Sequence, residues 1–145
     1  MNVKELALVF KQYYYHSNYR IFFVARYNED IIEIADENNE QEHFYNQNFG
    51  TYVLIAKTDT NRIRLVSLNY EELGVIEFSL TELDDVIRHD WTNYLKSTIR
   101  YLKEAGYRIN HGMDILIYGN IPNEVGLSSS TSIEALTAVI IKSLY

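Results

Sequence analysis

Hydrophobic and polar residues along this chain follow two periods, one typical of helices and one typical of strands. Apolar residues three and four positions apart predict a helix over residues 3–15, with a face formed by Leu6, Val9, Phe10, Tyr13 and Tyr14. The same spacing predicts a second helix, with Asp90 as N-cap, Gly106 as C′ residue and a stripe formed by Trp91, Leu95, Ile99 (or Thr98), Leu102 and Ala105. A third helix is predicted over residues 132–145, with Ile133, Leu136, Val139, Ile140 and Leu144 on its apolar side.

Runs of β-branched and aromatic residues predict strands between and around these helices. These runs are residues 20–24, 52–57, 62–67, 75–79 and 114–118. Because only the polar segment 58–61 separates two of them, 52–57 and 62–67 are predicted to pair as a hairpin. Residues 28–48 are rich in Glu, Asp and Asn, and we expect mostly loop there, with room for one poor strand. The length of the chain predicts a single domain over residues 1–145.

Composition narrows the classes of function. Hydrophobic residues make up 47% of the 145 positions and charged residues 23%, which is the composition of a folded domain. The absence of Cys excludes a disulfide framework, thiolate catalysis and a Cys zinc site. The net charge of −7 argues against a nucleic-acid partner but leaves a nucleotide open. No apolar run is long enough to span a membrane and no secretory signal opens the chain, so we expect a cytoplasmic protein.

One segment carries a pattern that points to chemistry. Residues 119–132 lie between a predicted strand and a predicted helix, and combine Gly with a cluster of Ser. Unpaired N–H groups at a helix N-terminus bind phosphate, and Ser hydroxyls add hydrogen bonds or a ligand for Mg²⁺. The alternative is that Ser residues simply cap the helix, because Ser is a favoured cap. The four His residues show no metal-ligand spacing; they are His16, His43, His89 and His111.

The order of residues in this segment resembles the phosphate-binding motif of the GHMP kinases. Pro122 and residues 126–130 form Pro-x-x-x-Gly-Leu-Ser-Ser-Ser, and the whole segment is most similar to the galactokinase version of the motif. Further segments resemble bacterial galactokinases in the same order along the chain, so that the resemblance covers residues 49–145. These segments are 50–52, the predicted hairpin, 67–80, 90–94 and 101–107.

This resemblance implies a fold, a reaction and a set of site residues. The fold would be an incomplete GHMP-kinase N-terminal domain, an α+β fold with a left-handed βαβ unit. The reaction would be transfer of the γ-phosphoryl group of ATP to the 1-hydroxyl of galactose, with Mg²⁺. The ATP phosphates would lie against Gly126, Leu127, Ser128, Ser129 and Ser130, and Ser130 would face the metal.

The chain departs from the galactokinase pattern in its sugar-binding signature, which falls on residues 25–40. Glu33 and Asp36 match carboxylates that bind sugar hydroxyls in the family, whereas Tyr27 and Ile34 replace the catalytic Arg and a His. Arg26 lies one position from the place of that Arg. Glu33 and Asp36 are therefore open to two interpretations. They are remnants of a sugar site, or they belong to a solvated acidic loop.

Two further departures affect activity. Glu124 and Val125 replace small residues, and a carboxylate beside a triphosphate repels it. In galactokinases the general base, a second metal-side carboxylate and the third glycine-rich motif follow the phosphate loop, and these 145 residues lack them. We therefore expect no catalysis by this chain alone, and self-association through an apolar patch on the last helix. Three hypotheses remain: a truncated galactokinase-related chain, a non-catalytic sugar- or nucleotide-binding or interaction module, and the remnant of a decayed gene.

Overall fold

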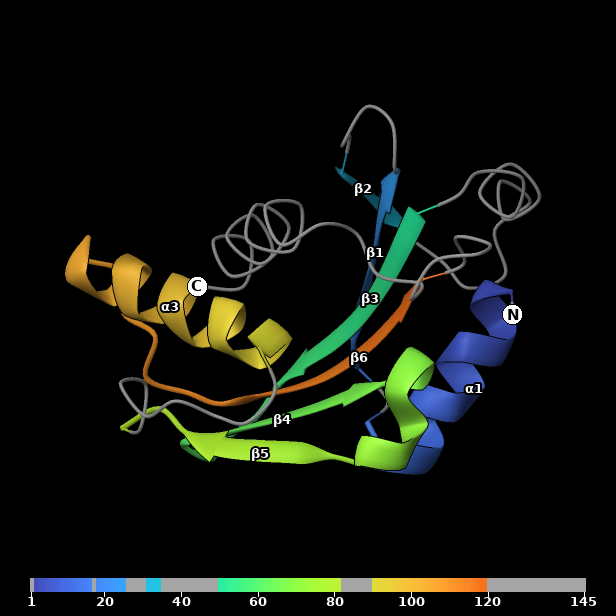
Figure 1. Ribbon diagram of the computed structural model, residues 1–145, viewed down its shortest axis with the longest axis horizontal. Helices are drawn as coiled ribbons and strands as arrows, with labels where there is room; N and C mark the ends of the chain where they lie inside the picture. Colours follow the sequence, from blue (N-terminus) through green and yellow to red (C-terminus); the bar gives the residue numbers. More distant parts are fainter. Residues whose placement is uncertain (1, 17, 26–30, 35–49, 82–89, 120–145) are drawn as a thin grey trace.

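Helices pack against a six-stranded sheet in this protein (Figure 1). The computed structural model describes residues 2–16, 18–25, 31–34, 50–81 and 90–119. The elements, in chain order, are α1 (Val3–Tyr14), β1 (Arg20–Ala25), β2 (Ile31–Ile34), β3 (Gly50–Lys57), β4 (Arg62–Ser67), the 3₁₀ helix η1 (Leu68–Leu73), β5 (Ile76–Ser79), α3 (Asp90–Glu104) and β6 (Met113–Gly119). Each predicted strand is therefore present within one or two residues, and β2 is the short strand for which the acidic segment left room.

The predicted hairpin is wrong, because β6 lies between β3 and β4. The order across the sheet is β2-β1-β3-β6-β4-β5, and among the strands of the described ranges only β4 and β6 pair in parallel. Ile115 of β6 faces Ile55 of β3 on one side and Leu65 of β4 on the other. A strand of this apolar character is stabilised most when neighbours cover both of its edges and both of its faces. The local pattern around residues 58–61 carries no information about that distant strand.

The backbone around Gly112 shows how β6 enters between the two strands. The Thr58 N–H donates to the Gly112 carbonyl at 2.9 Å, and the Gly112 N–H donates to the Thr60 carbonyl at 2.6 Å. A Cβ atom at Gly112 would lie 1.9 Å from the Arg62 carbonyl oxygen, so only Gly fits this close approach. The turn at 58–61 therefore opens the sheet for a third strand instead of closing a hairpin.

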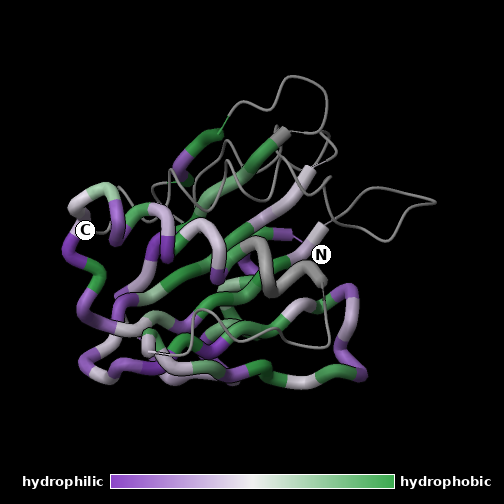
Figure 2. Tube along the Cα trace, turned by 60° about the vertical axis from the view of Figure 1, so that its left-hand side comes forward, coloured by the Kyte–Doolittle hydropathy of each residue, from purple (hydrophilic) through white to green (hydrophobic). Residues whose placement is uncertain are grey.

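The sheet buries an apolar layer on each face. Alternate strand residues point to opposite faces, and the interior of the sheet is mainly hydrophobic (Figure 2). One layer lies between the sheet and α3, and its residues include Phe22, Ile63, Phe78, Ile99, Leu102 and Ile115. The other lies between the sheet and α1, and its residues include Leu6, Phe10, Phe23, Tyr52, Leu54 and Leu116. The sheet thus separates the two helices (Figure 1).

The buried face of α1 differs slightly from the predicted one. Its buried residues are Val3, Leu6, Ala7, Phe10 and Tyr14. Tyr13, which was predicted to be buried, is 37% exposed, and Val9 is half-buried. The reason is that positions 3, 7, 10 and 14 define the centre of a helical stripe, and Tyr13 lies at its margin.

The C-terminal end of α3 was predicted correctly from Gly106. Gly106 has a φ of +102°, its N–H donates to the Lys103 carbonyl, and the Tyr107 N–H donates to the Leu102 carbonyl. These two bonds form a Schellman motif, in which Gly at C′ adopts a left-handed conformation. Ala105 is exposed, contrary to prediction, because it follows the last helical residue, Glu104.

The rest of the α3 prediction is confirmed except at its N-terminus. Leu95, Ile99 and Leu102 are buried, and Ile99 occupies the stripe in preference to Thr98. Asp90 is the first residue of the helix and not the cap before it. The Trp91 side chain, the predicted helix over residues 132–145 and its apolar patch lie outside the described residues.

Candidate functional site

The segment with the predicted phosphate-binding residues and the segment that joins β1 to β2 are attached to the same edge of the sheet. Strand β2 then runs away from this edge, so that Glu33 faces Phe22 and Ile34 faces Ile21. The parallel strands β4 and β6 both end at this edge, and the last residue of β6 is Gly119. Gly119 faces Thr51 of β3, Thr51 faces Val24 of β1, and Val24 faces Ile31 of β2. The segment that follows Gly119 and the segment that joins β1 to β2 therefore start two strands apart. In open sheets, ligands bind where the carboxyl ends of parallel strands meet.

A side-chain amide holds the end of β6 in place. Asn69 lies in η1, directly after β4. Its Oδ1 accepts a hydrogen bond from the Gly119 N–H at 2.8 Å, and its Nδ2 donates to the Gly119 carbonyl at 2.9 Å. The buried Ser67 hydroxyl accepts from the Asn69 N–H at 3.3 Å and fixes the first turn of η1. The Asn69 amide thus adds one rung to the β4–β6 ladder after the backbone of β4 has turned away.

Glu33 lies on a strand and not in a loop. It faces Phe22 across the β1–β2 pair, and its carboxylate accepts hydrogen bonds from Arg20 Nε at 3.0 Å and Arg20 Nη2 at 3.0 Å. The two side chains are 38% and 39% exposed. The loop interpretation is therefore wrong for Glu33. Its role toward a sugar stays a prediction, and a sugar hydroxyl would have to share this carboxylate with Arg20.

The remaining predicted site residues lie outside the described residues. They are Asp36, Gly126, Leu127, Ser128, Ser129 and Ser130, together with Arg26, Tyr27, Glu124 and Val125 of the departures from the family pattern. Within the described ranges, no three His, Asp or Glu side chains come together as metal ligands. No helix in that part of the chain is long and apolar enough to cross a membrane. Metal binding at Ser130 therefore stays a prediction.

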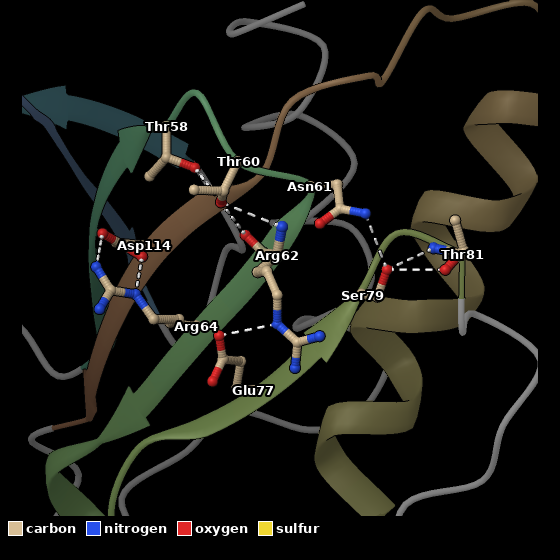
Figure 3. A network of polar contacts seen from close by, with 9 residues as sticks. All are labelled: Thr58, Thr60, Asn61, Arg62, Arg64, Glu77, Ser79, Thr81 and Asp114. Carbon is tan, nitrogen blue, oxygen red and sulfur yellow. Dashed lines mark hydrogen bonds and ion pairs between the residues drawn. The ribbon is translucent and has the colours of Figure 1, made fainter.

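The opposite end of β6 carries a buried charged cluster that sequence reasoning missed. Asp114 is 1% exposed, and its two carboxylate oxygens accept from Arg64 Nε at 2.7 Å and Arg64 Nη2 at 2.6 Å (Figure 3). His16 Nε2 lies 2.6 Å from Asp114 Oδ2. A buried carboxylate is tolerated when charged partners satisfy it in this way. The available signal was one acidic residue in an otherwise apolar strand.

Tyr14 joins this cluster to α1. Its hydroxyl donates to the Ile115 carbonyl at 2.9 Å, and the Arg64 guanidinium lies 5.1 Å from its ring centroid. Burial, assisted by the charge of Asp114, raises the pKa of the Tyr14 phenol above its ordinary value. The hydrogen bonds to Asp114 raise the pKa of the Arg64 guanidinium. These groups hold one another in place, so the cluster is an anchor for α1.

A cavity of about 390 Å³ lies near this anchor, between the segment around Tyr15 to Arg20 and the end of β3. That volume is in the range of small-molecule pockets. The cavity opens at the edge away from Gly119, however, and its Arg20 side chain is bonded to Glu33. The cavity is therefore separate from the edge at which the segment with the predicted phosphate-binding residues begins.

Comparisons with known proteins agree with this fold. Residues 93–145 match the GHMP kinases N terminal domain. A galactokinase of Streptococcus thermophilus is 42% identical over 146 aligned residues, which cover 100% of this chain and 37% of the relative. This chain is homologous to galactokinases. A galactokinase of Staphylococcus carnosus is 51% identical over 96 residues, covering 66% of this chain and 25% of the relative.

A solved galactokinase has the same architecture. The crystal structure of Lactococcus lactis galactokinase complexed with galactose superposes with a TM-score of 0.75 at 30% identity, over 98% of this chain and 37% of that one. The α+β fold described above is thus that of a GHMP-kinase N-terminal domain, as the resemblance implied. The chain spans about 37% of the length of the first galactokinases that it matches.

Proposed function

We propose that this chain is a galactokinase-type domain that binds the phosphates of ATP through residues 126–130 and galactose near Glu33 and Asp36. The family reaction is transfer of the γ-phosphoryl group of ATP to the 1-hydroxyl of galactose. We further propose that the chain does not carry out this reaction alone. The observation that supports the proposal most is that the segment with the predicted phosphate-binding residues follows the last residue of β6, at the edge where the parallel strands β4 and β6 both end.

Phosphate binding follows from the chemistry of the Gly-Leu-Ser-Ser-Ser sequence. Backbone N–H groups at the start of a helix bind a phosphate without a charged side chain. Mg²⁺, when bound with ATP, neutralises part of the triphosphate charge. The Ser130 hydroxyl is the group of this motif that we assign to the metal, and Ser128 and Ser129 are assigned to phosphate oxygens.

The missing turnover follows from Tyr27 and Glu124. Tyr27 stands where the family has the Arg that assists phosphoryl transfer, and cations of that kind are worth about 10³–10⁵ in rate. Glu124 adds a negative charge next to the triphosphate. Arg26 is the nearest cation in sequence to the missing Arg. Phosphate binding tolerates these changes better than catalysis does, since main-chain N–H groups and the hydroxyls of Ser128, Ser129 and Ser130 carry it together.

A second candidate is a module that binds nucleotide but no sugar. The ion pair between Arg20 and Glu33 favours it, because this pair engages both oxygens of a carboxylate that the sugar would need. The two candidates differ in one measurement. Galactose binding supports the first and its absence supports the second.

The test combines calorimetry with an assay of ADP release. Wild-type protein is titrated with MgATP and separately with galactose, and is then assayed for turnover with both. The double variant Ser129→Ala/Ser130→Ala removes the proposed hydroxyl ligands. The matched control is Ser97→Ala, which changes an exposed serine on α3.

We expect MgATP binding to wild type and to Ser97→Ala, loss of binding in the double variant, and no turnover in any form. Absence of MgATP binding to wild type would refute the proposal. Turnover at about 1 s⁻¹ or faster, the usual range of kinases, would show that Tyr27 and Glu124 do not limit the reaction.

A further inference from the structure

We infer that Asn69 is a positioning residue for the phosphate-binding segment. Its side chain fixes the direction in which the chain leaves β6 at Gly119, and by doing so it sets the affinity for the nucleotide's phosphates. The inference rests on the proposed function and extends it to a residue outside the Gly-Leu-Ser-Ser-Ser sequence.

Two hydrogen bonds from Asn69 hold the backbone of Gly119. Gly119 is buried, and both of its backbone polar groups are bonded to one amide, the N–H to Asn69 Oδ1 and the carbonyl to Asn69 Nδ2. On its other side, Gly119 faces Thr51 of β3. Two hydrogen bonds from one planar group fix the peptide planes before and after Gly119. The last of these planes leads directly into residue 120.

A side chain, and not the backbone of β4, bonds to the end of β6. The last β4 residue in the ladder is Ser67, which faces Ile117, and the chain then turns into η1. If β4 continued as a strand beyond Ser67, its backbone would supply the next hydrogen bonds to β6. The Asn69 amide supplies this rung of the ladder instead and lets β4 turn away. Gly119 is therefore held on this side by a side chain and not by the backbone of β4.

The two hydrogen bonds to Gly119 require an amide side chain at position 69. Only an amide offers one donor and one acceptor at this spacing, as the N–H and carbonyl of Gly119 require. An Asp at position 69 keeps the shape and the acceptor but places a negative oxygen against the Gly119 carbonyl. An Ala keeps neither bond. The three residues thus form a graded series at one position.

The experiment measures the hydrogen bonding of Asn69 to Gly119 and the binding of MgATP separately. Hydrogen exchange of the Gly119 amide is followed by NMR in nucleotide-free protein, and the Kd for MgATP is measured by calorimetry. The proteins are wild type, Asn69→Ala, Asn69→Asp and the control Asn61→Ala. Asn61 is exposed, and its Nδ2 donates a 3.4 Å hydrogen bond to Ser79 Oγ at the opposite end of the sheet (Figure 3).

We expect faster exchange at Gly119 and about tenfold weaker MgATP binding in both Asn69 variants, since ordering the segment then has to be driven by the ligand. Exchange of amides in the middle of β3 should stay unchanged, which separates a local effect from general destabilisation. Asn61→Ala should match wild type in both measurements.

Three results would overturn the inference, and they are distinguishable. Unchanged exchange at Gly119 in both variants would show that the amide does not hold the strand end. Faster exchange at Gly119 with an unchanged Kd would show that the Asn69 hydrogen bonds have no influence on MgATP binding, and would leave the proposed function intact. No MgATP binding by wild type would refute the proposed function and this inference with it.

Discussion

The two ends of β6 are held by different means. At the first end, the side chains of Arg64 and His16 converge on the buried carboxylate of Asp114. At the other end, the neutral amide of Asn69 makes two hydrogen bonds to Gly119. The charged end anchors α1 to the sheet, whereas the segment with the predicted phosphate-binding residues begins at the neutral end. The anchor and the root of that segment thus lie at opposite edges of one sheet.

The physical reason for this division is the direction of the strands. Because β4 and β6 are parallel, the loops that follow them emerge at one edge, and loops at such edges carry ligand-binding groups. A strong buried charge at that edge would compete with a charged ligand for the groups that bind the ligand. At the other edge no such conflict arises, and a satisfied ion pair can hold the elements together.

The largest expected effect on stability is that of Asp114→Ala. Arg64 and His16 lose their acceptor, and we expect the free energy of unfolding to fall by about 2–4 kcal/mol. Urea denaturation measures this change. The control is Glu77→Ala, which removes the partner of Arg62 from a surface pair with both side chains more than 40% exposed, and should cost less than about 1 kcal/mol. Equal losses in the two variants would contradict the anchoring role of the cluster.

The next effect is that of Gly112→Ala, at the entry of β6 on the same side. The new Cβ would lie 1.9 Å from the Arg62 carbonyl oxygen, so we expect a loss of about 1–3 kcal/mol or more. Gly106→Ala provides the comparison, because no atom lies within 4 Å of its Cβ position and only its positive φ opposes the substitution. That variant should lose about 1 kcal/mol. A larger loss at Gly106 than at Gly112 in urea denaturation would contradict this explanation.

Tyr14→Phe tests the anchor through its dependence on pH. Loss of the bond to the Ile115 carbonyl should cost about 1 kcal/mol at pH 7. The pKa of Tyr14 is raised in the folded protein from an ordinary value of 10.0, so its contribution is fully present below pH 10. Above pH 10 the unfolded chain releases this proton first, and wild type loses up to about 1.4 kcal/mol per pH unit from Tyr14 alone.

The stability difference between wild type and Tyr14→Phe should therefore shrink above pH 10 and change sign near pH 11. Urea denaturation of both proteins over this range measures the difference, and the other tyrosines cancel in it. A difference that stays constant with pH would show that the Tyr14 phenol ionises equally easily in the folded and unfolded chains.

The smallest expected effect on stability is that of Asn69→Ala. Since Asn69 is half-buried, water replaces part of the hydrogen bonding that its amide provides. We therefore expect the free energy of unfolding to fall by less than about 1 kcal/mol. The same variant should nevertheless weaken MgATP binding, whereas Tyr14→Phe should leave the Kd unchanged. If Tyr14→Phe weakened MgATP binding as much as Asn69→Ala, the division between the two edges would be wrong.

The sequence alone determined the local elements and the family. Periodicity located the two described helices and the strands, and Gly106 marked the end of α3, because these features depend on neighbours a few positions apart. The order of Gly, Leu and Ser residues in 126–130 identified the kinase family, since that chemistry is contained in one contiguous stretch.

Only the tertiary structure decided which distant residues meet. It placed β6 between β3 and β4, paired Arg64 with Asp114 and attached Asn69 to Gly119, and the residues of each of these two pairs are 50 positions apart. It also tied Glu33 to Arg20 on a strand where an acidic loop was one interpretation. Strand order and buried polar pairs depend on how whole elements cover one another's faces and edges, and that energy is absent from any local window of sequence.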